Sequence, residues 1–301
     1  MICVFSLIMD LAASKSHRND IIGLHGKTLE SVEFDVEILK EWMKKQPHLP
    51  EELLQDNFLE IHLIKNKFSV EKVKSKIESY CSMKGLKRLE YLFGDKICIP
   101  SKEPQFYIPL PQLTDDFHRI IVSKIWDQET WDIKRDFANG LAVREFWSRF
   151  DYNNGEIILF DLTDCSVHLL SKLRINVLSD FLEIVFKAHS ARVKEVHIIG
   201  KFASNIFSLT KTFLPSKIAS RVSVHDSAEF IADILPKNCL PRDYGGELKS
   251  LNEYRDDLDQ LYADHEEDLI RYLGTRARED LRQGGNIMNE MQGTFKKLEV
   301  D

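Results

Sequence analysis

The stretch Ile157-Ile158-Leu159-Phe160, which lies just after the turn residues Asn153-Asn154-Gly155, decides the fold. All four of its residues are apolar, and a strand without alternating polar residues is buried on both faces of its sheet. The run Val196-His197-Ile198-Ile199 has the same character apart from one histidine. Strands of this kind indicate a parallel sheet that helices cover on both faces.

The segments around these strands alternate between extended and helical patterns. Short β-rich runs occupy residues 106–108, 120–122 and 222–224, and helical patterns occupy residues 129–150, 167–189, 203–214 and 228–235. This alternation predicts an α/β fold in which helices flank a parallel-type mixed sheet. Residues 251–282 are rich in charged side chains and predict one long helix whose charged face is solvated rather than a binding site.

Residues 29–83 carry a helical pattern that precedes the sheet. Val36, Leu39 and Met43 recur at spacings of three and four, and His48-Leu49-Pro50 then interrupts the pattern. Ser69 suits the N-cap of a third helix. Because three short helices bury little surface alone, we expect a small all-α N-terminal domain that packs against the sheet domain.

The composition is that of an ordinary globular protein. The 301 residues include 41 Lys and Arg against 48 Asp and Glu, which gives a net charge of −7, and 43% are hydrophobic. These values exclude disordered, collagenous and coiled-coil proteins, and the negative charge argues against a nucleic-acid partner. The length suits one large domain with a small appendage.

Cysteine usage and hydropathy predict a cytoplasmic chain. Its five cysteines are scattered, which indicates reduced thiols rather than a disulfide framework; they are Cys3, Cys81, Cys98, Cys165 and Cys239. The sequence contains no run of about 18 apolar residues, so it predicts no transmembrane helix. Residues 1–13 are apolar but lack a basic start and contain Asp10, so we interpret them as a leader segment or an alternative start rather than a secretion signal.

Motifs for nucleotide binding and hydrolysis are absent. The sequence has no G-x-G-x-x-G, no P-loop and no G-x-S-x-G. Asp161 and Asp164 have a spacing that suits a hard cation, but we expect them to cap the next helix and satisfy loop amides instead. His189, His197 and His225 fall on different elements without ligand spacing. We therefore predict no catalytic residue, no metal site and no cofactor.

The charge balance reverses locally near the last strands. Residues 187–221 contain seven basic side chains and one acidic side chain, Glu195. Arg192 and Lys194 stand at the start of one strand, and Lys217 and Arg221 share a helix face before the next. Such clusters bind phosphates and anionic membrane surfaces, although a solvated basic face has the same sequence pattern.

The helical residues 203–214 have apolar side chains on two sides. One stripe contains Ile206, Leu209 and Phe213, and Phe207 and Leu214 lie off it. A short helix of this kind suits a mobile lid over an apolar cavity. An ordinary core helix shows the same pattern, so both interpretations stay open.

One motif and several shorter stretches carry a family resemblance. The motif is Leu240-Pro241-Arg242-Asp243-Tyr244-Gly245-Gly246, an L-P-x-x-Y-G-G pattern, and the stretches are residues 39–50, 67–72, 158–162, 196–199, 213–218 and 293–301. Together they make residues 30–301 resemble the CRAL-TRIO (Sec14-like) lipid-binding family. The sequence is most similar to the alpha-tocopherol transfer protein-like branch in its arthropod form.

The resemblance implies a bilobal protein with an apolar cavity under a helical gate. The expected divisions are a leader segment at residues 1–28, a helical domain at 29–95, a lipid-binding domain at 96–255 and a C-terminal helical tail at 256–301. In the tocopherol branch, four basic positions bind phosphoinositide headgroups and promote ligand release. They match Arg192, Lys194, Lys217 and Arg221 here.

Several residues depart from the family pattern. Gly200-Lys201-Phe202-Ala203 replaces an Asn-Pro segment, Asp164 replaces a glycine, and Ile61 and Ile64 replace common arginines. Ala191 stands where phosphatidylinositol-transferring members carry a glutamate. This last departure argues against phosphatidylinositol as the cavity ligand.

These features favour a non-enzymatic intracellular carrier of one hydrophobic small molecule, a tocopherol-, retinoid- or similar lipid, exchanged at phosphoinositide membranes. We expect a monomer in the cytoplasm that visits intracellular membranes transiently. The expected cavity wall is Phe137, Leu141, Ile158, Phe160, Val185, Ile198, Ile206 and Leu209. The alternative is a phosphoinositide-binding trafficking adaptor without an exchanged ligand, and an enzyme that uses Asp161 and Asp164 to hold a metal ranks third.

Overall fold

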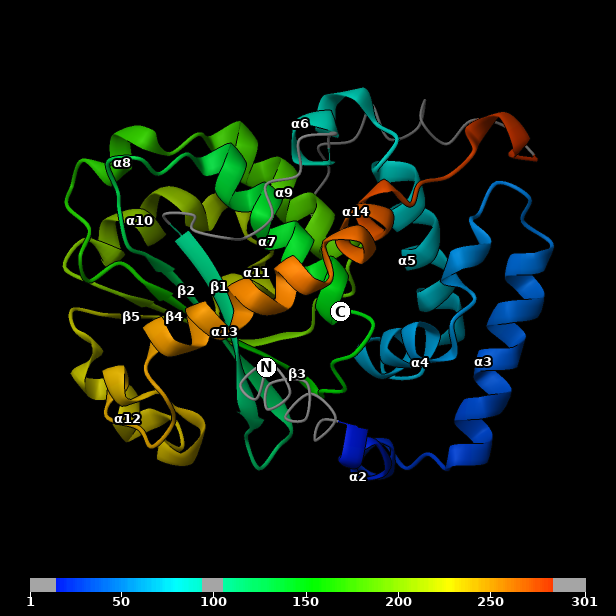
Figure 1. The fold of residues 1–301 in the computed structure, drawn as a ribbon, viewed down its shortest axis with the longest axis horizontal. Helices are drawn as coiled ribbons and strands as arrows, with labels where there is room; N and C mark the ends of the chain where they lie inside the picture. Colours follow the sequence, from blue (N-terminus) through cyan, green and yellow to red (C-terminus); the bar gives the residue numbers. More distant parts are fainter. Residues whose placement is uncertain (1–14, 94–104, 284–301) are drawn as a thin grey trace.

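The computed structural model describes residues 15–93 and 105–283 (Figure 1). Residues 1–13, Cys3, Cys98 and the C-terminal stretch 293–301, which the sequence analysis used, lie outside these ranges. Every helix within the two described ranges is too short or too polar to cross a lipid bilayer.

A mixed sheet forms the centre of the larger domain. In the described part of the chain it has five strands in the spatial order β1-β2-β3-β4-β5, namely β1 (Gln105–Leu113), β2 (His118–Ile125), β3 (Gly155–Asp161), β4 (Val193–Ile199) and β5 (Val222–His225). The strands β2 to β5 are parallel, and β1 is antiparallel to β2. The predicted α/β fold with a parallel-type mixed sheet is confirmed. The edge strand β1 is antiparallel because the chain reverses in a tight turn, where the Phe117 amide donates to the Thr114 carbonyl at 2.7 Å.

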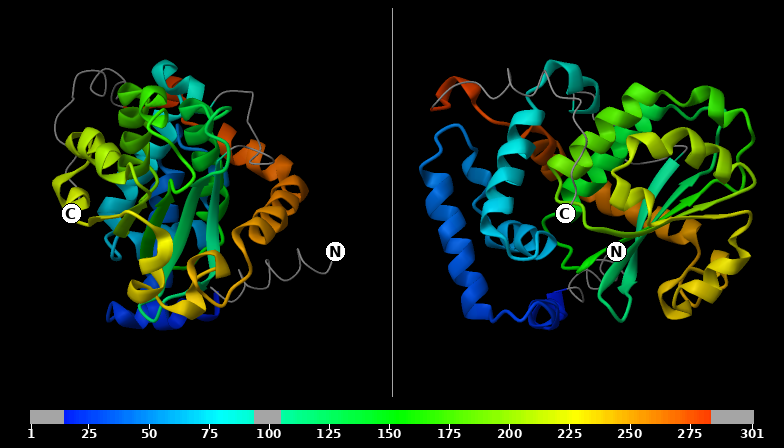
Figure 2. Two further views of the ribbon diagram at one scale, coloured as in Figure 1. Left: turned by 90° about the vertical axis from the view of Figure 1, so that its left-hand side faces the viewer. Right: turned by 180° about the vertical axis from the view of Figure 1, so that it is seen from behind.

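Helices cover both faces of this sheet, as the apolar strands predicted. Ile157 and Leu159 of β3 point to the face that packs against α13 (Leu251–Asp264). Ile158 and Phe160 point to the opposite face, which α7 (Ile133–Trp147), α9 (Ile175–Lys187) and α10 (Ala203–Thr210) cover (Figure 2). Since neighbouring side chains of a strand alternate in direction, one continuous apolar strand contributes to two separate layers.

Two predicted helices of the sheet domain have different bounds in the structure. The helix predicted at residues 129–150 begins at Ile133, because the Asp132 carboxylate caps it by accepting from the Lys134 and Arg135 amides. The prediction of a single helix at residues 167–189 is wrong. The chain instead forms α8 (Leu169–Lys172) and α9, separated by extended backbone at residues 173–174. This break lets α8 and α9 both turn apolar side chains toward the same cavity.

The segments after β4 are shorter than their patterns predicted. The helix predicted at 203–214 ends at Thr210, and the helix predicted at 228–235 splits in two. The remaining elements are η3 (Lys211–Phe213), α11 (Ser216–Ala219), η4 (Ala228–Phe230), α12 (Ile231–Ile234), η5 (Lys237–Cys239) and η6 (Arg242–Tyr244).

The charged C-terminal region is two main helices rather than the one predicted at residues 251–282. The helix α13 ends at Asp264, α14 (Glu266–Gly274) follows, and η7 (Glu279–Leu281) ends the described chain. The predicted solvated face is present on α13, where Asn252, Glu253 and Asp256 are exposed. The opposite face is buried, because Leu258 and Tyr262 lie in the core beside the sheet. The expected boundary between residues 255 and 256 lies inside α13.

The N-terminal region is helical, as predicted. Its elements are α2 (Arg18–Leu24), α3 (Leu29–Lys44), η1 (Glu51–Leu53), α4 (Asp56–Lys65), α5 (Val70–Met83), η2 (Lys87–Leu89) and α6 (Glu90–Phe93). Ser69 caps α5 by accepting from the Lys72 amide at 3.4 Å, which confirms its predicted role. The predicted interruption at residues 48–50 separates α3 from η1.

The L-P-x-x-Y-G-G motif closes the sheet domain onto the end of β3. The Tyr244 hydroxyl donates to Asp161 Oδ2 at 2.8 Å. Gly245 has φ +75°, a left-handed conformation that a side chain disfavours. A Cβ atom on Gly246 would lie 2.0 Å from the Leu240 carbonyl oxygen. The two glycines therefore serve a backbone turn.

A buried carboxylate joins the N-terminal helices to the sheet domain. Glu145 of α7 is fully buried, and its Oε1 lies 2.7 Å from Nζ of Lys84 at the C-terminal end of α5. Its Oε2 accepts from the Tyr80 hydroxyl and lies 3.4 Å from Nη1 of Arg149. Lys84 also donates to the Tyr272 carbonyl of α14 at 2.8 Å. We call these five residues the Glu145 network; it connects α5, α7 and α14.

The charges around Glu145 keep it ionised. Burial alone would raise the pKa of this carboxyl, but the Lys84 and Arg149 cations outweigh burial and lower the pKa to about 2. His189 lies 3.6 Å from Glu145 Oε1, and burial lowers the pKa of its imidazole to about 3, so it is neutral at pH 7.

We predict that Glu145→Gln lowers the free energy of unfolding by about 3–5 kcal/mol at pH 7, because it leaves two buried cations without their counter-ion. The wild-type contribution exists above the carboxyl's ordinary pKa of 4.5 and is lost as the pH falls toward 2. Urea unfolding at several pH values measures both effects. Glu41→Gln, which breaks an exposed pair with Lys44, is the control that leaves stability unchanged. A Glu145→Gln protein as stable as the wild type would contradict this account.

Candidate functional site

An apolar cavity of about 220 Å³ lies between the sheet and the helices α7 to α10. The strand register builds its floor, because Ile121, Ile158, Val196 and Val222 are consecutive cross-strand neighbours on β2 to β5. All four side chains face the cavity. The apolar strands thus supply a flat hydrophobic floor, and the helices supply the walls and roof.

Six of the eight predicted wall residues line this cavity: Phe137, Ile158, Phe160, Val185, Ile198 and Ile206. Leu141 does not; it is fully buried in the core on another side of α7. Phe137, Gly140 and Arg144 lie on the cavity side of α7. Because successive residues of a helix are rotated by about 100° around its axis, Leu141, which follows Gly140, points away from the cavity. Leu209 also lies elsewhere, because it is 50% exposed on the outside of α10.

The cavity has a polar end that the sequence analysis missed. Tyr107 of β1 and Asp136 and Arg144 of α7 line it there. Burial raises the pKa of Tyr107 well above 10, and the nearby Asp136 raises it further, so the phenol stays protonated. The sequence does show polar residues within the helical pattern at 129–150, and this could have indicated a polar part of the cavity. Only the fold shows which side of α7 faces the cavity.

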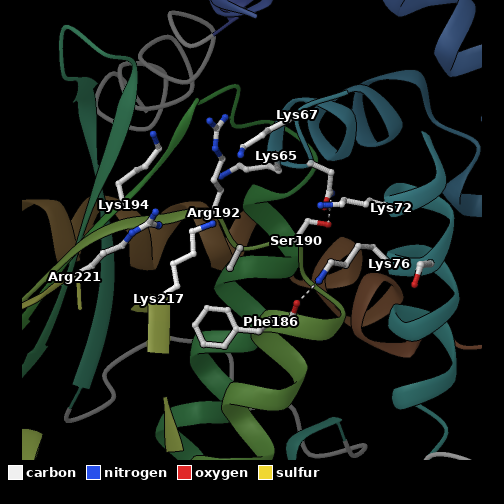
Figure 3. Close-up of a pocket in the computed structure, with 13 residues that line it drawn as sticks. Lys65, Lys67, Lys72, Lys76, Phe186, Ser190, Arg192, Lys194, Lys217 and Arg221 are labelled. Atoms are coloured by element: carbon white, nitrogen blue, oxygen red, sulfur yellow. Dashed lines mark hydrogen bonds between the residues drawn. The ribbon is translucent and has the colours of Figure 1, made fainter. Parts of the chain in front are cut away.

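A second pocket, of about 350 Å³, is strongly basic (Figure 3). It brings together the four predicted phosphoinositide-binding residues, Arg192, Lys194, Lys217 and Arg221, which we call the basic cluster. The N-terminal domain completes the pocket with four lysines that the sequence analysis missed: Lys65, Lys67, Lys72 and Lys76. No carboxylate lines this pocket among the residues that the structure describes.

Hydrogen bonds hold the arginines of the basic cluster without neutralising them. Arg192 Nη1 donates to Asn154 Oδ1 at 2.6 Å, and Arg221 Nη1 donates to the Val193 carbonyl. In the described ranges, no carboxylate forms an ion pair with any member of the cluster. The positive charge of the basic cluster is therefore available to an anion, whereas Lys65 in the same pocket pairs with Glu156 at 2.8 Å.

Burial and mutual repulsion lower the pKa of two members of the basic cluster. The pKa of Arg192 is lowered by burial and by the charge of Arg221. The pKa of Lys194 is lowered by burial and by both arginines. Because a bound anion removes this repulsion, phosphate groups have a favourable electrostatic site here.

Comparison with known proteins adds to this geometry. Residues 113–246 match the model of the CRAL/TRIO domain, and residues 28–96 match the model named Pinta-like, UBA domain. The sheet domain is thus similar to the CRAL/TRIO domain, which confirms the predicted resemblance over residues 113–246. The match ends at Gly246, the last residue of the L-P-x-x-Y-G-G motif.

Curated relatives agree with this assignment over part of their length. A mouse protein named alpha-tocopherol transfer protein-like is 32% identical over 102 residues, and its human counterpart is 30% identical over the same length. The aligned region spans 33% of this chain and 30% of those proteins. The crystal structure of Sfh5 superposes with a TM-score of 0.45 and 13% identity, covering 65% of this chain and 77% of that one. The arthropod form of the branch stays a prediction.

Asp161 and Asp164, the two carboxylates whose spacing suits a hard cation, both form ion pairs with one lysine. Lys124 Nζ lies 3.0 Å from Asp161 Oδ2 and 2.7 Å from Asp164 Oδ2. Asp161 Oδ1 accepts from the Thr163 amide at 3.0 Å, which confirms the predicted loop-amide role for this residue. The expectation that the two carboxylates also cap the next helix is wrong, because His168 is the N-cap residue of α8. The lysine ammonium thus occupies the place that a hard cation needs between the two carboxylates.

Two of the three histidines, His197 on β4 and His225 on β5, lie side by side on neighbouring strands. His197 Nδ1 lies 3.0 Å from His225 Nε2, and His197 Nε2 lies 3.2 Å from Glu195 Oε2. The mid-strand His197 is thus a buried, hydrogen-bonded histidine. Groups of three or more residues with metal-ligand geometry are absent from the described ranges.

The apolar cavity and the basic pocket share one wall of the CRAL/TRIO domain. Phe186, near the end of α9, lines both of them and is 7% exposed. Its ring packs with the core that surrounds the cavity, and its backbone carbonyl accepts from Lys76 in the basic pocket (Figure 3). The two sites are therefore neighbours that one residue separates.

Proposed function

We propose that the protein is a non-enzymatic carrier that holds one hydrophobic small molecule in the apolar cavity and exchanges it at phosphoinositide membranes. The observation that carries this proposal is the pair of adjacent sites, one apolar and one cationic, with Phe186 between them. The CRAL/TRIO domain match over residues 113–246 supports it, as does the name of the mouse and human relatives.

The cavity lining favours a largely apolar ligand. Burying about 300 Å² of apolar ligand surface contributes about 7 kcal/mol before the entropic costs of binding. The polar end at Tyr107, Asp136 and Arg144 suits a ligand with one hydrogen-bonding group. A tocopherol-like or retinoid-like molecule has this combination of a long apolar body and a single polar end.

Ligand entry requires the gate helix to move. A cavity of 220 Å³ is smaller than a whole lipid, so α10 must shift outward when the ligand binds. Ala203 is the buried residue of α10, while the cavity-facing Ile206 and Thr210 are only half-buried. A helix held by so little buried surface is well suited to act as the gate.

The partners of the polar residues support a binding protein rather than an enzyme. The third-ranked interpretation needed Asp161 and Asp164 to hold a metal, and both are engaged by Lys124. The proposed carrier works as a monomer in the cytoplasm and visits membranes transiently. The adaptor without an exchanged ligand remains the second candidate, because the basic pocket by itself suffices to bind a headgroup.

We predict that Ile198→Trp abolishes binding of a fluorescent tocopherol or retinoid analogue, because the indole ring occupies the space above the middle of the sheet. Leu209→Trp, on the exposed side of α10, is the control that keeps wild-type affinity. Fluorescence titration measures affinity, and circular dichroism checks that both variants are folded. Wild-type ligand affinity in a folded Ile198→Trp protein would contradict the carrier proposal and leave the adaptor.

We also predict that Lys217→Ala combined with Arg221→Ala weakens binding to phosphoinositide vesicles about 30-fold, since each contact contributes about 1 kcal/mol near the surface. Ligand affinity in solution is unchanged. Lys201→Ala with Lys211→Ala removes the same charge from exposed positions outside the pocket and has a much smaller effect. Equal vesicle binding by the two double variants would show that only net charge matters.

A further inference from the structure

Three charged side chains form a continuous chain behind the polar end of the apolar cavity. Arg144 of α7 lines the cavity, and Lys65, the last residue of α4, belongs to the N-terminal domain. Glu156 of β3 lies between these two cations. Its Oε1 is 2.8 Å from Lys65 Nζ, and its Oε2 is 3.0 Å from Arg144 Nη1. The side chains of Lys65, Arg144 and Glu156 are only 9%, 19% and 8% exposed, so these contacts are shielded from water.

The strand β3 places Glu156 next to the cavity without letting it reach the ligand. Side chains two residues apart on a strand share a face, so Glu156 is on the same face as Ile158 and Phe160, which form part of the cavity. Glu156 is not among the described residues that line that cavity. It lines a separate chamber of about 50 Å³ together with Lys65 and Arg144, and this space suits a few water molecules. Glu156 therefore acts on a ligand through Arg144.

The charge of Arg144 is compensated from the side that faces away from the ligand. Burial alone would raise the pKa of the Glu156 carboxyl, but the Arg144 and Lys65 cations outweigh burial and lower the pKa to about 2. Glu156 is therefore an anion at pH 7. A guanidinium group has five N–H donors, so the ion pair with Glu156 leaves donors that can serve a ligand.

A second carboxylate stands at the same end of the cavity. Asp136 and Arg144 both line the cavity, and Gly140 is halfway between them on α7. The Tyr107 ring packs against this glycine, where a Cβ atom would lie 2.9 Å from ring carbons. The polar end of a ligand thus meets a phenol, a carboxylate and a guanidinium that already has its counter-ion.

This set of groups treats neutral and anionic ligands differently. A ligand carboxylate must leave water, compete with Glu156 for Arg144 and approach the carboxylate of Asp136. A hydroxyl group carries no charge, and it can both accept and donate a hydrogen bond. It therefore uses the remaining Arg144 donors without disturbing the ion pair.

We propose that Glu156 is a positioning residue that makes the cavity select molecules ending in a neutral hydroxyl group over molecules ending in a carboxylate. The ligand class is that of apolar alcohols and phenols. Glu156 keeps Arg144 as a hydrogen-bond donor and prevents it from acting as the counter-ion of an acid. This inference rests on the proposed carrier function and names the class of molecule that the carrier holds.

The test measures the affinity of the full chain at pH 8 for two matched pairs of ligands, by displacement of a fluorescent lipid analogue. The pairs are retinol with retinoic acid and hexadecanol with hexadecanoic acid. The wild type binds each alcohol at least tenfold more tightly than the corresponding acid. Glu156→Gln lowers this ratio at least fivefold, because Arg144 then pairs with the ligand carboxylate. Glu195→Gln removes an exposed carboxylate that pairs with His197, and it keeps the wild-type ratio.

Two further variants separate this role from a structural one. Glu156→Gln leaves two cations without their counter-ion, so Lys65→Gln combined with Glu156→Gln removes one of these cations and shows the same change of ratio in a better balanced protein. Arg144→Met, added to the double variant, abolishes the gain in acid binding. Circular dichroism checks that each variant is folded.

The outcomes distinguish this inference from the proposed function. Equal wild-type affinity for alcohols and acids, or a wild-type ratio in folded variants that lack Glu156, would overturn the role of Glu156 and leave the carrier proposal intact. A wild type that binds none of the four ligands would instead contradict the carrier function and this inference with it.

Discussion

The buried carboxylate of Glu145 is the contact on which the arrangement of the two domains depends. It holds Lys84 and Tyr80 at the end of α5, Arg149 on its own helix and, through Lys84, the Tyr272 carbonyl of α14. Because a buried ion network is strongly destabilised when one partner is removed, it tolerates few relative positions of these helices. The apolar contacts between the domains fill space, whereas this network fixes orientation.

The fixed position of α5 has a consequence for the ligand sites. The same helix that carries Tyr80 into the Glu145 network carries Lys76 to the Phe186 carbonyl at the end of α9. Phe186 in turn separates the basic pocket from the apolar cavity. Under the proposed function, an anion bound in the basic pocket would act on this shared wall, which would link contact with an anionic membrane to release of an apolar ligand.

Sequence patterns predicted the layers of the fold and named six residues that line the cavity, because strand alternation and apolar periodicity are local properties. They failed where direction around a helix decides the outcome: Leu141 and Leu209 are apolar residues on the correct helices but face away from the cavity. They also missed Lys76, since a lysine in an amphipathic helix has the pattern of a solvated residue until the fold places another domain beside it. The break between α8 and α9 was equally invisible, because no proline or glycine marks it.

The central claim is that this CRAL/TRIO domain carries one apolar molecule, and native mass spectrometry tests it most directly. The purified chain is incubated with a total lipid extract, re-isolated by gel filtration and weighed intact, and its ligand is then extracted and identified. The account predicts one hydrophobic molecule with a single polar group per chain. A chain that emerges without a stoichiometric ligand would contradict the account.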